Sequence, residues 1–94
     1  MTDKQQTFYR VYSGDSTGSF LTAVKPRSSA FAREALALQP GNTAAFVQEV
    51  IVPAGTRLQR SCALPAFGRR GGAEQFELLQ RIPDENFGPG VALP

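Results

Sequence analysis

Hydrophobic and polar residues alternate over short stretches of this chain, which predicts several short β-strands rather than long helices. Residues 7–12 and 19–24 are rich in β-branched and aromatic side chains, and a run of small polar residues and glycine separates them. We therefore expect two strands that form a hairpin or a strand-turn-strand corner. Arg10 falls in the middle of the first strand, where a charged side chain needs a partner or a ligand.

One segment has the composition of a helix. Residues 30–38 are rich in alanine and leucine, which are strong helix formers. Ser28 or Ser29 is a candidate N-cap before them, and a Pro-Gly pair at residues 40–41 ends the pattern. The sequence therefore predicts one main helix, which carries Arg33.

The second half of the chain predicts further strands. Residues 44–52 are mostly apolar and predict a strand that is partly buried on both faces near its end. Residues 56–63 suggest a short strand followed by a loop, and residues 74–79 suggest another strand. Residues 83–94 contain too much proline and glycine for regular structure and are expected to form an irregular tail. The prediction is an α+β fold with about five short, mostly antiparallel strands and one main helix.

Composition agrees with one folded domain. The chain has 94 residues, of which 41% are hydrophobic and 19% charged, so it can build one modest core. We expect a single domain over residues 1–94, with its core at about residues 7–82. No apolar run approaches the roughly 20 residues that a membrane span needs, and the N-terminus lacks the apolar part of a signal peptide. We expect a soluble chain that could be one piece of a larger exported protein.

The small number of cysteine and histidine residues limits the chemistry. With one cysteine and no histidine, the chain has no intrachain disulfide, no multi-cysteine zinc site and no Ser/His or Cys/His catalytic pair. Cys62 is expected to be a small buried packing residue. The formal net charge of +2 is too small to indicate nucleic-acid binding by itself. We therefore expect no metal, and neither nucleic acid nor membrane as a partner.

A basic, glycine-rich segment at residues 67–73 leads directly into the strand predicted at residues 74–79. Gly71 and Gly72 would let the backbone approach an anion closely, since glycine lacks a Cβ atom. The sequence therefore predicts an anion-binding loop beside a strand.

Side chains of that strand alternate between its two faces. Phe76 and Leu78 are expected to face one side, and Gln75 and Glu77 the other. Two polar groups on one face, next to a glycine-rich loop, indicate a candidate site.

Four short motifs stand in a characteristic order along the chain: R-V-Y-S-G at residues 10–14, G-S-F-L-T at 18–22, F-A-R at 31–33, and P-A-F-G-R-R-G-G-A-E-Q-F-E-L at 65–78. Their order and spacing resemble the tuberculosis necrotizing toxin family of NAD(P) glycohydrolases. The resemblance covers about residues 8–80, and its most specific part runs from Phe67 to Gln75.

The resemblance implies a small relative of the ADP-ribosyltransferase fold that hydrolyses the nicotinamide–ribose bond of NAD and NADP without a metal. NAD(P) would be the substrate and not a cofactor. Members of this family are C-terminal toxin domains of larger bacterial effectors. The resemblance therefore also implies delivery by a secretion system, action in the cytosol of a target cell, and a cognate immunity protein as partner.

The resemblance also assigns roles to individual residues. Arg10 is similar to the phosphate-binding arginine of the family, Gln75 to its catalytic glutamine, and Arg33 to a second arginine of the site. The mycobacterial toxin has a histidine in its pocket, and this chain has none. Either another residue takes that place or the activity differs.

A dinucleotide site needs arginines for the phosphates, backbone N–H groups, an aromatic platform, and a polar group near the anomeric carbon. Cleavage passes through an oxocarbenium-like state, so Gln75 could orient the ribose or a water molecule and Glu77 could stabilise positive charge. Tyr9 and Tyr12 face opposite sides of their strand, so at most one of them faces the ligand. The candidate catalytic residues are Gln75, Arg10 and Glu77, and the candidate substrate-binding residues are Arg33, Tyr12, Ser13, Gly14, Phe20, Thr22, Phe67, Gly71 and Gly72.

Two alternatives remain open from the sequence. Gln75 and Glu77 also fit the Gln-x-Glu signature of mono-ADP-ribosyltransferase toxins, with Arg10 as the early-strand arginine and Ser19 or Thr22 as the middle Ser/Thr motif. The same polar residues could instead be a solvated strand face of a non-enzymatic binding module.

Overall fold

The computed structural model describes residues 4–13, 20–36, 38, 42–66 and 68–94. This part of the chain contains six strands, one α-helix and one short 3-10 helix. In chain order they are β1 (Gln6–Tyr12), β2 (Phe20–Leu21), α1 (Ser29–Ala35), β3 (Phe46–Val52), β4 (Leu58–Cys62), β5 (Glu74–Leu78), the 3-10 helix η1 (Asp84–Asn86) and β6 (Val91–Ala92). The predicted α+β class is confirmed.

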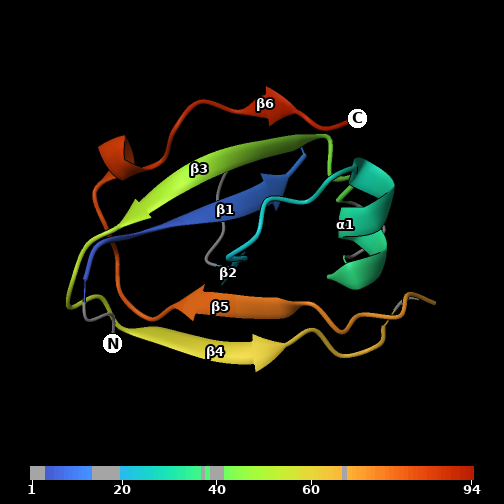
Figure 1. Ribbon diagram of the computed structural model, residues 1–94, viewed down its shortest axis with the longest axis horizontal. Coiled ribbons are helices and arrows are strands. Elements are labelled where there is room, and N and C mark those ends of the chain that lie inside the picture. Colours follow the sequence, from blue (N-terminus) through green and yellow to red (C-terminus); the bar gives the residue numbers. More distant parts are fainter. Residues whose placement is uncertain (1–3, 14–19, 37, 39–41, 67) are drawn as a thin grey trace.

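The strands form two antiparallel three-stranded sheets, ordered β1-β3-β6 and β2-β5-β4 (Figure 1). β1 and β3 pair along their whole length, from Gln6 opposite Val52 to Tyr12 opposite Phe46. A bridge between Tyr9 and Thr22 joins the two sheets, since each backbone N–H donates to the other residue's carbonyl oxygen at 2.8 Å. β1 and β2 therefore meet at a corner between two sheets, which was one of the two arrangements expected.

The hydrophobic core lies where the two sheets face each other. Its buried members come from both sheets and from the segment after β5, and they are Phe8, Leu21, Val50, Val52 and Ile82. Phe76 and Leu78 of β5 pack against this cluster, and the Phe76 ring meets the Phe8 ring edge-on at 4.9 Å between centroids. Burial of such side chains stabilises the fold by about 1.5–3 kcal/mol each. The predicted inward face of β5 is confirmed.

Helix α1 stands at one end of the sheets, beside the C-terminal end of β1 and the N-terminal end of β5 (Figure 1). Of the two candidate caps, Ser28 is the N-cap, and its hydroxyl accepts a hydrogen bond from the N–H of Phe31 at 3.0 Å. The helix ends at Ala35, three residues before the predicted end. No helix in the described part of the chain is long and apolar enough to cross a membrane.

The C-terminal segment, residues 83–94, was predicted to be irregular, and this prediction is wrong. It contains η1 and β6, and β6 pairs with Phe46 and Val47 at the edge of β3. Glycine permits this close approach: a Cβ atom at Gly90 would collide with the hydroxyl of Tyr12. The edge of β3 offers backbone groups that need partners, and the segment supplies them despite its composition.

Cys62 is exposed, so its predicted burial is also wrong. Its strand, β4, lies at the edge of its sheet. The core reaches only Leu58, at the beginning of this strand, and the four residues that follow are exposed.

Candidate functional site

Arg10 is buried in the middle of β1, with 3% of its surface exposed. Its Nε donates a hydrogen bond to Oε1 of Gln48 at 2.7 Å. The guanidinium also lies over the ring of Tyr12, with 4.7 Å between its central carbon and the ring centroid. The expectation that a charge in this strand needs a partner is therefore confirmed.

The two tyrosines of β1 have different surroundings. Tyr12 stacks on Phe46, with the ring centroids 5.6 Å apart, and its ring also packs against the guanidinium of Arg10. Tyr12 was predicted to bind substrate, whereas this structure uses its ring for packing against its neighbours. Tyr9, on the opposite face of the strand, lines a pocket.

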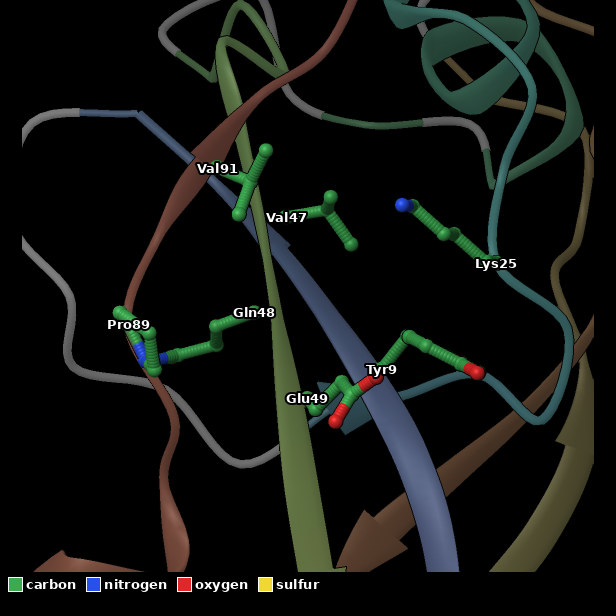
Figure 2. A pocket seen from close by; sticks show the side chains of 7 residues that line it. All are labelled: Tyr9, Lys25, Val47, Gln48, Glu49, Pro89 and Val91. Atoms are coloured by element: carbon green, nitrogen blue, oxygen red, sulfur yellow. The ribbon is translucent and has the colours of Figure 1, made fainter.

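That pocket has a volume of about 140 Å³ (Figure 2). The side chain of Lys25 points toward Val47 from the connection between β2 and α1. The complete lining is Tyr9, Lys25, Val47, Gln48, Glu49, Pro89 and Val91. An ammonium, a phenol and a carboxylate thus surround an apolar floor, although none of these three groups was predicted to belong to the site.

Gln75 and Glu77 lie on the face of β5 that points away from Phe76 and the core. Gln75 Nε2 donates to Ser61 Oγ at 3.3 Å, and Glu77 lies opposite Phe20 of β2. Phe20 is 53% exposed. The structure therefore brings Gln75, Glu77 and Phe20 to one face of the β2-β5-β4 sheet.

Arg10 and Gln75 do not share a face. Arg10 lies two residues from Phe8 in β1, on the side where Phe8 meets Phe76. Gln75 points to the other side of Phe76's strand. Of the three predicted catalytic residues, Arg10 thus lies on the inner face of the strands, and Gln75 and Glu77 lie on the outer face.

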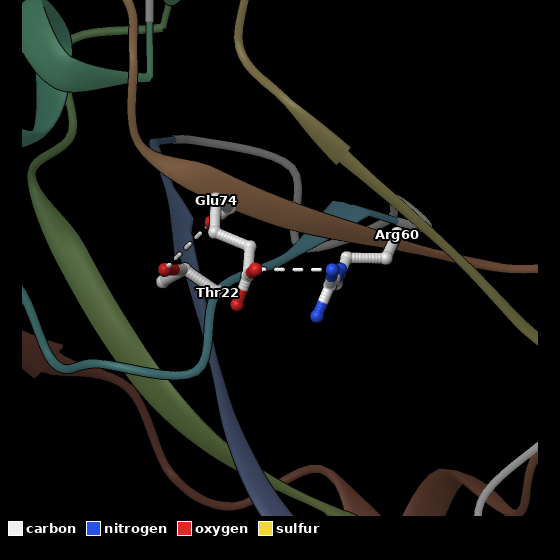
Figure 3. A network of polar contacts seen from close by, with 3 residues as sticks. All are labelled: Thr22, Arg60 and Glu74. Carbon is white, nitrogen blue, oxygen red and sulfur yellow. Dashed lines mark hydrogen bonds and ion pairs between the residues drawn. The ribbon is translucent and has the colours of Figure 1, made fainter.

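The N-terminal end of β5 connects the two faces, because Glu74 points inward and Gln75 outward. Thr22, 8% exposed, donates from its hydroxyl to the backbone oxygen of Glu74 at 3.3 Å (Figure 3). The carboxylate of Glu74 lies 3.4 Å from Nε of Arg60 in the neighbouring strand. The residue before Gln75 is therefore held through its backbone by Thr22 and through its side chain by Arg60.

Replacement of Thr22 by valine tests this contact. Valine keeps the shape and removes the hydroxyl, so we expect a loss of about 1 kcal/mol in the free energy of unfolding. Thr7→Val, at an exposed position of β1, is the matched control and should leave stability within about 0.5 kcal/mol. Urea unfolding measures both variants, and equal stability of the two would show that the Thr22 hydroxyl does not hold β5.

The glycine-rich segment packs against its own chain. Gly71 N–H donates to the carbonyl oxygen of Glu34 at 2.8 Å, and Gly72 N–H donates to that of Ala63 at 2.7 Å. Gly71 and Gly72 were predicted to let the backbone approach a substrate anion closely, and in this structure both amides are engaged within the chain. The Gly71 bond attaches the segment before β5 to the end of α1, and the Gly72 bond attaches it to the residue that follows β4.

The remaining predicted residues lie at the end of the molecule where α1 stands, or they lie outside the described part of the chain. Arg33 is half-buried in the last turn of α1. The hydroxyl of Ser13 accepts a hydrogen bond from the N–H of Thr43 at 3.0 Å, which ties the end of β1 to the segment before β3. Gly14, Ser19 and Phe67 lie outside the described residues.

Sequence reasoning missed Gln48 and the pairing of Arg60 with Glu74. Gln48 has a signal in the sequence, because it is a polar residue in phase with the apolar Val50 and Val52. Arg60 has a weaker one, since strand register decides which carboxylate it reaches.

Comparison with known proteins gives one likeness, which concerns the fold. No protein-family model matches the sequence, and no curated protein matches it closely. The structure is similar to Tne2, solved in complex with Tni2, with a TM-score of 0.77 and 22% sequence identity. The match covers 99% of this chain and 88% of that chain. This small α+β architecture of two sheets and one helix is therefore shared with Tne2.

Proposed function

We propose that this chain is an NAD(P) glycohydrolase toxin domain that hydrolyses the nicotinamide–ribose bond and depletes NAD(P) in a target cell. The proposal rests on the agreement of two observations, one from the sequence and one from the fold. The ordered motifs that resemble the tuberculosis necrotizing toxin family occur in a chain whose fold is similar to Tne2 over 99% of its length.

The N-terminal end of β5 is the proposed site of cleavage. Gln75 is half-buried and uncharged, so its amide can hydrogen-bond the ribose or a water molecule without changing protonation. Glu77 lies on the same face and supplies negative charge for the oxocarbenium-like transition state. The exposed ring of Phe20, opposite Glu77, offers a flat surface for the nicotinamide.

Arg10 is the proposed partner of the diphosphate, which reaches its guanidinium, 3% exposed in this structure, when the side chains that cover it move. A dinucleotide that contacts both Gln75 and Arg10 has to bend around the end of β5, where the inner and outer faces meet. Arg60 lies on the inner side of that end, where it is exposed and paired with Glu74, and its guanidinium offers N–H donors along the path.

A second protein is part of the proposal. Tne2 was solved in complex with Tni2, and we propose that a cognate immunity protein covers the site of this chain. An acidic surface would complement exposed arginines such as Arg70. We further propose that a secretion system delivers the domain within a larger effector, and that it acts in the cytosol of the target cell.

One observation favours a second candidate. Glu77 and Gln75 share a face, which is the arrangement that a mono-ADP-ribosyltransferase needs for its Gln-x-Glu pair. The two activities differ in the acceptor, which is water in the first case and a protein side chain in the second.

The deciding experiment is incubation of the purified chain with NAD or NADP and no protein acceptor, followed by measurement of free nicotinamide and ADP-ribose. Equal amounts of both products would support the glycohydrolase. Labelled protein bands that form only when cell lysate is added would indicate the transferase. No reaction in either assay would leave a binding module without enzymatic activity.

A further inference from the structure

Gln48 is a buried polar residue on the inner face of the β1-β3-β6 sheet. It is 7% exposed and lies directly opposite Arg10 in the register of β1 and β3. Its neighbours on the same face of β3, Val50 and Val52, are fully buried apolar residues. A buried amide at such a position is costly unless both of its ends are hydrogen-bonded.

Both ends of the Gln48 amide are used. Oε1 accepts from Arg10 Nε at 2.7 Å, and Nε2 donates to the backbone oxygen of Gly88 at 2.8 Å. An amide oxygen only accepts and an amide nitrogen only donates, so the two bonds together define one orientation of the group. The bond at Nε and the Tyr12 ring beneath the guanidinium then fix the plane of Arg10.

The C-terminal segment holds Gln48 in turn. The N–H of Gly88 donates to the carbonyl oxygen of Glu49 at 2.7 Å, so Gly88 is bonded to β3 through both its N–H and its C=O. Two residues further on, Gly90 lies against the hydroxyl of Tyr12. The segment that carries β6 is therefore in contact with both supports of the Arg10 guanidinium.

We propose that Gln48 is a positioning residue, which fixes the guanidinium of Arg10 for contact with the diphosphate of the substrate and is itself held by Gly88. The part that concerns the substrate rests on the proposed function. Arginine binds phosphate through directed N–H groups, so the orientation of its plane decides how well it binds.

The kinetic test is Gln48→Leu, which is similar in size and removes both hydrogen bonds. A phosphate contact of Arg10 is made in the ground state and in the transition state alike, so its loss should raise KM by about tenfold and change kcat less than about threefold. A merely structural role would lower the fraction of active protein, which reduces the apparent kcat at constant KM. Gln6→Leu, at an exposed glutamine of β1, is the matched control and should change neither constant.

A second readout does not depend on enzyme activity. The Nε–H of Arg10 should give a slowly exchanging NMR signal in the wild-type chain, because it is buried and hydrogen-bonded, and Arg10→Lys assigns that signal. Gln48→Leu should abolish the protection. Gln48→Glu retains an acceptor for Arg10 and should restore it.

The outcomes separate this inference from the proposed function. Hydrolysis by the wild type with an unchanged KM in Gln48→Leu would overturn the positioning role and leave the function standing. If the wild type hydrolyses neither NAD nor NADP, the proposed function fails. The Nε–H signal of Arg10 then decides alone whether Gln48 orients the guanidinium. Fast exchange of that signal in the wild type, or unchanged protection in Gln48→Leu, would overturn the inference even if a variant proved unstable.

Discussion

Gln75→Ala should lose NAD hydrolysis by about 100-fold or more in kcat, because the variant lacks the polar group that faces the ribose or the attacking water. The fold should remain intact. Gln75 makes a long bond of 3.3 Å to Ser61 on an exposed face, so we expect the free energy of unfolding to change by less than about 0.5 kcal/mol. Nicotinamide release and urea unfolding, measured on the same preparation, test the two parts.

Two further variants make this result interpretable. Ser61→Ala removes the neighbour of Gln75 and keeps Gln75 itself, so its activity should stay close to that of the wild type. Glu77→Ala distinguishes the two reactions, since it should be the more damaging change if transfer to a protein is the real activity. Full activity of both Gln75→Ala and Glu77→Ala would show that the site lies elsewhere.

Gly71→Ala should destabilise the fold by about 3 kcal/mol through backbone strain and overpacking. The φ angle of Gly71 is +69°, which L-residues rarely adopt, and a Cβ atom there would collide with the backbone oxygen of Ala63. The other close atoms belong to the backbone of Leu64, and no movable side-chain end is among them, so relief requires a shift of the segment between β4 and β5. Urea unfolding measures the loss.

Gly68→Ala is the matched control for this prediction. Its φ of +72° is nearly the same, but the space around its Cβ position is open to 4 Å. We expect it to cost only about 1 kcal/mol, which is the part that arises from φ alone. Equal losses in the two variants would show that the contact with Ala63 is not important for stability.

The sequence predicted those elements whose signals are local. Alternation along residues 74–78 gave both the strand and its two faces, since Phe76 and Leu78 pack on the core as expected. Ser28 was recognised as a possible helix cap from its position before an alanine-rich run, because the cap bond spans only three residues.

The parts that were missed depend on contacts between distant residues. The C-terminal segment lacks any strong strand signal, and β6 forms because the edge of β3 supplies a partner more than 40 residues earlier in the chain. Gln48 likewise becomes significant only when the register places it opposite Arg10.

The motif order assigned Arg10 and Gln75 to one candidate site, but it did not show which way their side chains point. Arg10 and Gln75 each occur in a recognisable motif, yet strand alternation sends one inward and the other outward. A motif determines the spacing of residues along one strand. Which faces of β1 and β5 point toward each other depends on how the two sheets meet at Tyr9 and Thr22.

The attachment of Gly88 to β3 also has a consequence for folding during synthesis on the ribosome. Synthesis runs from the N-terminus, so β1 and β3 leave the ribosome well before residues 88–92. A nascent chain that stops short of Gly88 lacks the acceptor for the amide of Gln48 and the glycine that lies on Tyr12. The surroundings of Arg10 are therefore completed only after β1, β3, β4 and β5 have been made.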